Sequence, residues 1–267
     1  MSNSRGSSRG TSEKKENCVK EFVVSDNFKI MMEESLPAAR AVLEKRKKDL
    51  NNWGRHHEEF ERIFGVSGNN EIEHFFTVYD TKSGNSVRES ELTTVKEFMR
   101  KSIDRMIVIC NSLYVDKQRE IVVDVYGDKG NKNKEILYAC GSFINKTDDD
   151  EFSAFVLNDQ TWRKTVEEYR STLKINIGQR FICKKIMGRD SKASTLCHEI
   201  SHFNRFGFFS DEVKGSMGGV GTRDLPDDKD YKGTKVYISH ANDLVKNHDI
   251  NVFKSAYNFE RYFEIVV

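Results

Sequence analysis

Apolar residues in the first part of the chain recur at the three- and four-residue spacing of an amphipathic helix. Ser25 and Asp26 are suited to cap such a helix at its N-terminus. Pro37 falls inside the pattern, so the helix is expected to split or kink there. The apolar stripe comprises Phe28, Met31, Met32, Leu36, Ala39, Val42 and Leu43.

Two further helices are predicted before residue 115. Residues Trp53 to Phe64 carry Phe60 and Ile63, and Gly65 can end this helix as a left-handed C-cap. A long helix is predicted from about Ser90 to Leu113. Its stripe comprises Leu92, Val95, Phe98, Met99, Ile103, Met106, Ile107 and Cys110.

The second part of the chain changes to the pattern of short strands, followed again by helices. Residues Lys129 to Lys134 are rich in Gly, Asn and Lys and predict a turn. The predicted strands are Ile121–Tyr126, Ile136–Phe143, Phe152–Leu157 and Leu173–Ile182. The predicted helices are Ser191–Phe203, Ser239–Asn247 and Asn251–Glu264. A helical half followed by a small, mostly antiparallel sheet and further helices predicts an α+β fold.

Length and composition are compatible with one folded domain. The chain has 267 residues, of which 37% are hydrophobic and 32% charged. Residues 1–24 begin with a segment rich in Ser, Gly, Arg and Lys and are predicted to form a disordered tail. Residues 25–267 would then form the domain, with a helical subdomain over about 25–115. The sheet and the candidate site would occupy about 116–267.

Charge and cysteine usage exclude several classes of protein. The 43 basic residues nearly balance the 42 acidic ones, so no nucleic-acid or membrane surface is expected, and no apolar run is long enough to span a membrane. The five cysteines form no C-x-x-C pair and do not resemble a disulfide scaffold. We expect most of them to be reduced, and a single disulfide is the alternative. They are Cys18, Cys110, Cys140, Cys183 and Cys197.

The sequence His198-Glu199-Ile200-Ser201-His202 is an H-E-x-x-H motif inside a predicted helix. Residues four apart lie on the same helical face, so His198 and His202 can direct two imidazoles at one metal ion. Glu199 lies beside the first histidine, where a general base is required. The flanking positions are uncharged, as expected of a buried helix. This pattern predicts a catalytic zinc site.

A catalytic zinc needs a third protein ligand, and several candidates follow the motif. Asp224 lies at the end of Gly221-Thr222-Arg223-Asp224 and is our preferred ligand. The metzincin pattern fails, because the positions that it requires to be Gly and His are Arg205 and Phe208. A glutamate ligand, as in gluzincins, stays open. The candidates for it are Glu212, Glu260 and Glu264.

H-E-x-x-H followed by G-T-x-D resembles the aspzincin metalloendopeptidases, the group of deuterolysin and the peptidyl-Lys endopeptidases. The resemblance covers roughly residues 35 to 265, although it is weak outside the two motifs. It implies a zincin-like fold and one zinc ion held by His198, His202 and Asp224, with Glu199 as general base. Flanking segments similar to the family are Trp53–Gly65, Ser153–Val156, Ile175–Ile182 and Ser255–Phe263.

The resemblance breaks at the tyrosine that stabilises the oxyanion in this family. That residue stands three positions after the ligand aspartate, where this chain has Asp227. Tyr231 and Tyr237 are the candidates that follow. We favour Tyr237 as the catalytic tyrosine, because Tyr237 to Ala241 resembles the family's Y-G-x-x-A segment just before the next helix.

The same resemblance suggests where a substrate side chain would bind. Lys-specific members of the family place two acidic residues in the pocket beyond the scissile bond. Alignment on Tyr262 and Phe263 puts Asn258 and Arg261 at those substrate-binding positions. With two negative charges lost and one positive charge gained, no preference for lysine is expected.

The predicted activity is that of a zinc-dependent metalloendopeptidase. There are two alternatives. One is a binding or effector protein that keeps this fold but cleaves nothing, and the other is a zinc amidase that acts on a non-protein amide. We expect a monomer that acts on a protein or peptide. Because the N-terminus lacks the apolar region of a Sec signal, export by another route as an effector is expected, with a cytoplasmic location as the alternative.

Overall fold

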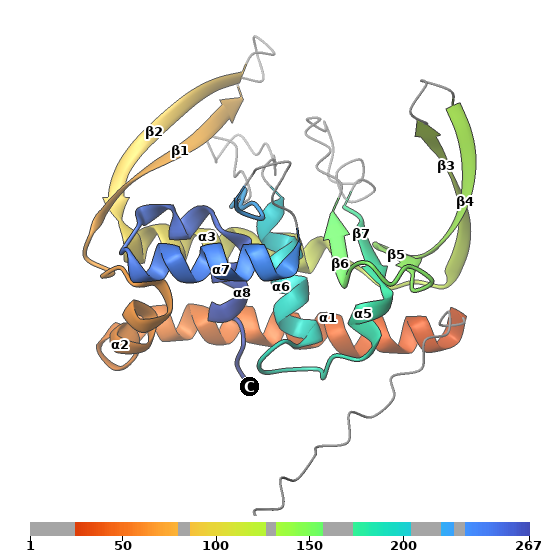
Figure 1. Cartoon of the computed structure of the whole chain (residues 1–267), viewed down its shortest axis with the longest axis horizontal. Helices are drawn as coiled ribbons and strands as arrows, with labels where there is room; N and C mark the ends of the chain where they lie inside the picture. Colours follow the sequence, from red (N-terminus) through yellow and green to blue (C-terminus); the bar gives the residue numbers. More distant parts are fainter. Residues whose placement is uncertain (1–24, 80–85, 127–131, 157–172, 204–219, 227–232) are drawn as a thin grey trace, which may run out of the picture.

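The computed structural model describes residues 25–79, 86–126, 132–156, 173–203, 220–226 and 233–267 (Figure 1). It has a mixed α+β fold, as the sequence predicts. The predicted tail, residues 1–24, lies outside the described residues. The helices are α1 (Ser25–Asn51), α2 (Trp53–Phe64), α3 (Val95–Ser112), α5 (Gln179–Ile182), α6 (Lys192–His202), α7 (Thr234–Lys246), the 3-10 helix η1 (Ile250–Lys254) and α8 (Ala256–Tyr262).

The strands form two separate sheets at opposite ends of the helical layer (Figure 1). A two-stranded hairpin pairs β1 (Glu71–Tyr79) with β2 (Ser86–Thr94). The five-stranded sheet has the order β3-β4-β5-β7-β6, and every neighbouring pair is antiparallel except β5 and β7. The prediction of a small, mostly antiparallel sheet is confirmed. Its strands are β3 (Gln118–Tyr126), β4 (Lys132–Cys140), β5 (Phe143–Lys146), β6 (Ala154–Val156) and β7 (Ile175–Gly178).

The first two predicted helices form, and the first one begins at Ser25 and extends to Asn51. The apolar stripe of α1 is buried, apart from Met31, which is partly buried. The prediction that Pro37 splits this helix is wrong, because α1 continues through it. Buried residues of the same stripe lie on both sides of Pro37, and tertiary packing contributes more to helix stability than propensity does. Gly65 adopts the predicted left-handed C-cap of α2, with φ of 70°.

The β1–β2 hairpin has no counterpart among the predicted elements. The helix predicted from Ser90 begins only at Val95, where the Thr94 hydroxyl accepts a hydrogen bond from the Glu97 amide. Leu92 therefore belongs to β2, and 67% of its surface is exposed. Its spacing from Val95 fits a helix, but a short apolar run does not distinguish strand from helix.

Three other predicted boundaries in the second half are wrong. The strand predicted over Ile136–Phe143 is divided into β4 and β5 at Gly141, whose φ of 63° suits a tight turn between antiparallel strands. Residues 132–134 of the predicted turn belong to β4. The strand predicted over Leu173–Ile182 ends at Gly178, after which α5 begins.

The C-terminal helices also differ from their predicted bounds. Helix α7 begins at Thr234 rather than Ser239, so Tyr237 lies within the helix and not before it. The helix predicted over Asn251–Glu264 is two helices, η1 and α8. Ser255 separates them, because its hydroxyl accepts a hydrogen bond from the Asn258 amide and so begins a new helix.

One hydrophobic core joins the two predicted subdomains. It contains residues of α1, α2 and α3 together with residues of α6, η1 and α8, and α6 packs against α1, α3 and α8. Cys110, Cys140 and Cys197 are free and buried, as expected, whereas Cys183 is disulfide-bonded. In the described part of the chain, no helix has the length and apolarity needed to cross a membrane.

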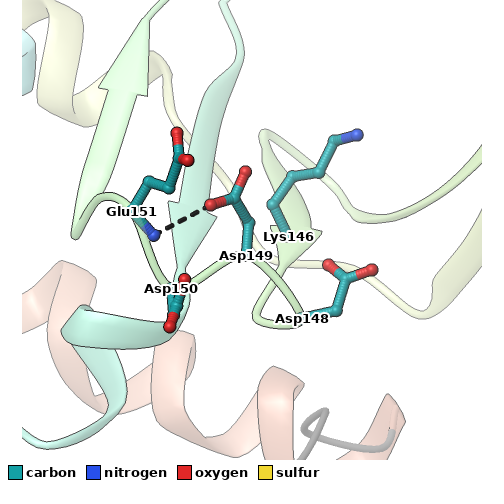
Figure 2. A pocket seen from close by; sticks show the side chains of 5 residues that line it. All are labelled: Lys146, Asp148, Asp149, Asp150 and Glu151. Atoms are coloured by element: carbon teal, nitrogen blue, oxygen red, sulfur yellow. Dashed lines mark hydrogen bonds between the residues drawn. The ribbon is translucent and has the colours of Figure 1, made fainter.

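The acidic run Asp148 to Glu151 forms an exposed turn after β5. Asp148, Asp150 and Glu151 are exposed, and together with Lys146 and Asp149 they line a hollow (Figure 2). The Asp149 carboxylate accepts a hydrogen bond from the Glu151 amide, so it stabilises the turn. This run is not among the groups of described residues arranged to hold a metal ion.

Arg46 connects three helices in the interior. Only 2% of its surface is exposed. Its Nε donates to the Tyr262 carbonyl of α8 at 2.5 Å, and its guanidinium lies 4.2 Å above the ring of the same residue. Two further nitrogens bind the Glu59 carboxylate of α2 at 2.9 and 3.1 Å. Arg46 thereby fixes the end of α8, the helix that also reaches the candidate site.

We expect Arg46→Ala to lower the free energy of unfolding by about 1–3 kcal/mol, because it removes the side-chain donor to the carbonyl of the buried residue Tyr262. Denaturant unfolding followed by circular dichroism would measure the loss. Lys29→Ala is the control, since the ion pair of Lys29 with Glu33 is largely exposed and should contribute at most about 0.5 kcal/mol. Equal stability of the two variants would contradict the role of Arg46.

Candidate metal centre

The H-E-x-x-H motif lies on α6, the most completely buried helix around the site. Every residue of α6 is buried. Ser191 begins the helix, because its hydroxyl accepts from the Ser194 amide while the Ser194 hydroxyl accepts from the Ser191 amide. This capping box fixes the first turn of the helix. The predicted helix from Ser191 to Phe203 is confirmed, with these two residues as its caps.

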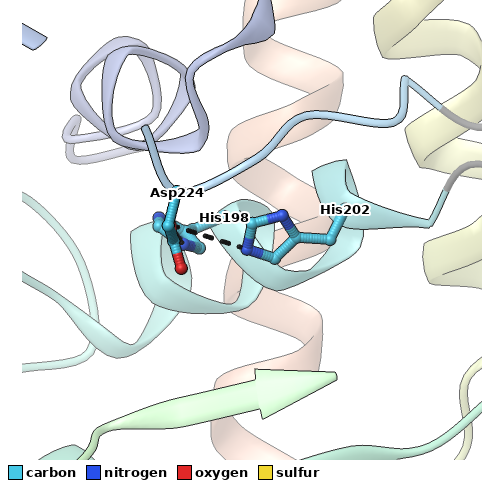
Figure 3. A group of neighbouring side chains, drawn as sticks. All are labelled: His198, His202 and Asp224. Carbon is cyan, nitrogen blue, oxygen red and sulfur yellow. Dashed lines mark ion pairs between the residues drawn. The ribbon is translucent and has the colours of Figure 1, made fainter. Parts of the chain in front are cut away.

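His198 and His202 direct their Nε2 atoms toward Asp224 (Figure 3). The distances to Asp224 Oδ1 are 3.1 Å from His198 and 3.8 Å from His202. The imidazole rings are nearly perpendicular, with centroids 4.8 Å apart. The structure thus brings together the three residues that the two sequence motifs predict as ligands.

The segment that carries Asp224 is held on both sides. On the α6 side, the Thr222 amide donates to the Ser201 carbonyl at 3.1 Å, and the hydroxyls of these two residues are 2.5 Å apart. On the other side, Arg223 pairs with Ser255 as an isolated parallel bridge. Asp224 is therefore positioned by backbone contacts to the motif helix and to the junction of η1 and α8.

The three residues suit a divalent metal ion. His198, His202 and Asp224 each offer one ligand atom, and these atoms all lie within 4.8 Å of one another. The Asp224 Oδ1 atom is buried, and its nearest charged partners are the Nε2 atoms of the two histidines. Two imidazoles and a carboxylate are a donor set that binds zinc. This group could hold a metal ion.

Both histidines use their second ring nitrogen for a protein contact. His202 Nδ1 lies 2.9 Å from the Thr222 carbonyl oxygen, and His198 Nδ1 lies 3.1 Å from Glu260 Oε2. Since a carbonyl oxygen only accepts, the proton of His202 is on Nδ1. Metal-binding histidines commonly have such a partner, which leaves Nε2 as the ligand atom.

The electrostatics of the two histidines differ. Burial lowers the pKa of His198, but hydrogen bonds with Asp224 and Glu260 outweigh it and hold this pKa well above its ordinary value. Burial and the charge of His198 lower the pKa of His202 to about 4. His202 is therefore neutral near pH 7, and a metal ion would have to displace a proton from His198.

Glu199 follows His198, one of the three candidate ligand residues, and is only 4% exposed. Its Oε2 atom is buried without a hydrogen-bond partner. Burial, reinforced by the charges of Asp224 and Glu260, raises the pKa of Glu199 to about 8. Such a carboxyl group can change its protonation state near neutral pH, which is what general acid–base catalysis requires.

Glu260 is not placed as the third ligand. It faces Nδ1 of His198, on the opposite side of the ring from the Nε2 atom that faces Asp224. Glu264 accepts a hydrogen bond from the Asp190 amide at 2.8 Å. The remaining glutamate candidate, Glu212, lies outside the described residues. Among the described candidates, the geometry supports Asp224.

Tyr257 is an aromatic neighbour of the site that the sequence did not single out. Its ring centroid is 4.9 Å from that of His198, with the planes nearly perpendicular. Burial raises the pKa of Tyr257 well above its ordinary value, and the charges of Asp224, Glu260 and Glu199 add to this effect. The ring centroid of Tyr237 is 5.6 Å from that of Tyr257. Tyr231 and Asp227 lie outside the described residues.

Of the two predicted substrate-binding residues of α8, Asn258 is turned away from the candidate metal centre. Asn258 has no exposed surface, and its Nδ2 donates to the Ala241 carbonyl of α7 at 3.1 Å. Its side chain is therefore closed to a substrate in this conformation. Arg261 is half-buried, and its role stays a prediction. The α8 residues that contact the motif are Tyr257 and Glu260, one position earlier than the alignment suggested.

Comparison with models of known protein families finds no match for this chain. Comparisons with curated proteins and with solved structures also find none.

Proposed function

We propose that this protein is a zinc-dependent metalloendopeptidase of the aspzincin type, with a zincin-like fold. The observation that carries the proposal is the convergence of His198 Nε2, His202 Nε2 and Asp224 Oδ1 beside a buried, unpartnered oxygen of Glu199. Three protein ligands and a neighbouring carboxylate are the composition of a hydrolytic zinc site. Resemblance in the two sequence motifs supports the same assignment.

The roles of the residues follow from their positions. His198, His202 and Asp224 would hold the zinc ion, which would supply a Lewis acid and lower the pKa of a water molecule to about 7. Glu199 accepts the proton of the attacking water and donates it to the amine that leaves, so it acts first as base and then as acid. Thr222 keeps the proton of His202 on Nδ1 and positions Asp224 through its backbone.

A tyrosine hydroxyl is proposed to stabilise the oxyanion of the scissile carbonyl. Tyr237 is the residue favoured by the sequence resemblance, and Tyr257 is closer to His198. Because a single oxyanion donor contributes about 10²–10³ in kcat, the tyrosine that donates should show a loss of that size on change to phenylalanine.

We expect Tyr237→Phe to lower kcat by about 10²–10³ with little change in KM. Peptide hydrolysis at saturating substrate would measure it. Tyr257→Phe and Tyr231→Phe are matched variants, since each also removes one hydroxyl. A large loss in either of these, with Tyr237→Phe near the wild-type rate, would move the role to that residue.

Metal analysis and a casein digest test the function itself. The purified protein should contain about one zinc per chain and cleave casein, and a chelator should remove both properties. Zinc binding without cleavage of casein would favour a binding protein that retains the fold, or an amidase for a non-protein substrate. Cleavage that survives complete removal of metal would refute the proposed mechanism.

A further inference from the structure

We propose that Glu260 is a positioning residue, which from α8 fixes the orientation and the tautomer of His198 for metal binding. This inference rests on the proposed metal centre and concerns a residue outside the two sequence motifs. It assigns to α8 a part in building the site, in addition to its part in the hydrophobic core.

The Glu260 carboxylate contacts two residues of α6 that are one turn apart. Its Oε2 atom lies 3.1 Å from His198 Nδ1, and its Oε1 atom lies 3.4 Å from the Thr195 hydroxyl, which donates to it. Residues three apart are neighbours on a helical face. One carboxylate therefore spans the turn of α6 that leads into the metal site, and only 15% of its side chain is exposed.

This contact determines which nitrogen of His198 carries the proton. A neutral imidazole has one donor and one acceptor nitrogen, and a carboxylate accepts but does not donate. With one proton held on Nδ1 by Glu260, Nε2 faces Asp224 and is the nitrogen that becomes free for a metal ion once its own proton is displaced. His202 obtains the same arrangement from a neutral backbone carbonyl, so His198 alone depends on a charged side chain.

The position of Glu260 is itself fixed by contacts along α8. Ser255 caps the start of the helix, and Asn258 binds the Ala241 carbonyl of α7. At the other end, Arg46 binds the Tyr262 carbonyl. Lys184 donates to the Thr195 hydroxyl at 2.8 Å and so orients the second partner of the carboxylate. Glu260 is thus held rigidly enough to orient another side chain.

The affinity for zinc, measured at fixed pH by competition with a chromophoric chelator, tests this role without any assay of activity. We expect Glu260→Ala to bind zinc about 10–100-fold more weakly, the range typical of a lost outer-shell partner. Glu260→Gln keeps an acceptor oxygen but loses the charge, so its affinity should fall by less. Thr195→Val removes only the second contact of the carboxylate and should have the smallest effect.

Glu264→Ala is the matched control, because it removes a half-buried carboxylate from the same end of the chain without a contact to His198. Its affinity for zinc should lie within about twofold of the wild-type value. We count a change of that size as no effect, because the loss expected for Glu260→Ala is about 10–100-fold. Circular dichroism of each variant shows that the affinity is measured on folded protein. If Glu260→Ala does not fold, Glu260→Gln decides the question. Wild-type affinity in a folded Glu260 variant would overturn the positioning role.

The same titrations separate this inference from the proposed function. If the wild type binds one zinc and His198→Ala does not, the metal centre stands whatever the result for Glu260. If the wild type binds no zinc, the metal centre fails and the positioning role fails with it. A loss of affinity in the Glu260 variants but not in Glu264→Ala supports both.

Discussion

Glu199→Gln is expected to keep the fold and the bound metal while losing nearly all turnover. The amide has the shape of the carboxylate, so the buried position should accommodate it without a cavity. An amide cannot accept the proton of the attacking water, and general acid–base groups contribute about 10²–10⁴ to the rate. Initial rates of peptide hydrolysis would measure the loss, and metal analysis would show that zinc is retained.

Glu264→Gln is the control for this prediction, because it makes the same chemical change in a carboxyl group that binds the Asp190 amide. It should hydrolyse peptides at about the wild-type rate. A Glu199→Gln variant that keeps zinc and more than about one tenth of the wild-type kcat would exclude Glu199 as the general base, since such groups contribute at least about 10².

Loss of a metal ligand should have the second large effect. His198→Ala and His202→Ala should abolish zinc binding, because each removes one of only two imidazole donors. Asp224→Ala should lower the affinity for zinc strongly. The loss should exceed the range of about 10–100-fold that is typical when a residue outside the ligand set is replaced. Metal content after dialysis, followed by titration with a competing chelator, would measure both effects.

His57→Ala serves as the control, since His57 lies on α2 with its ring 6.5 Å from that of Trp53 and belongs to no described metal group. It should retain one zinc per chain. Full zinc occupancy in Asp224→Ala would contradict the aspzincin assignment. The third ligand would then have to be sought among the glutamates, beginning with Glu260 and Glu212.

Features set by neighbours in sequence could be predicted from the sequence. His198 and His202 share a face because four residues make about one turn of a helix, so their convergence needed only the helix itself. The Gly65 C-cap is equally local, since it depends on one residue that tolerates positive φ. The stripe of α1 also marked its buried face correctly.

The register of α8 could not be read from the sequence. Two pairs of residues could have faced α6: Tyr257 with Glu260, or Asn258 with Arg261. The members of each pair are three residues apart, and the second pair is displaced from the first by one residue. The structure resolves this choice because Asn258 is fully buried against Ala241 of α7, which turns Tyr257 and Glu260 toward His198. The packing of α8 against α6 and α7 therefore determines which pair faces His198, and helical spacing alone does not specify that packing.

The sequence by itself indicated the three candidate ligands and the helix that carries two of them. The tertiary structure decided how Asp224 reaches them, through backbone contacts with Ser201 and the Ser255 junction. It also placed Glu260 behind His198, although 62 residues separate them in the chain. Local spacing fixes directions around one helix, whereas contacts between distant segments depend on how the buried faces of all the helices pack together.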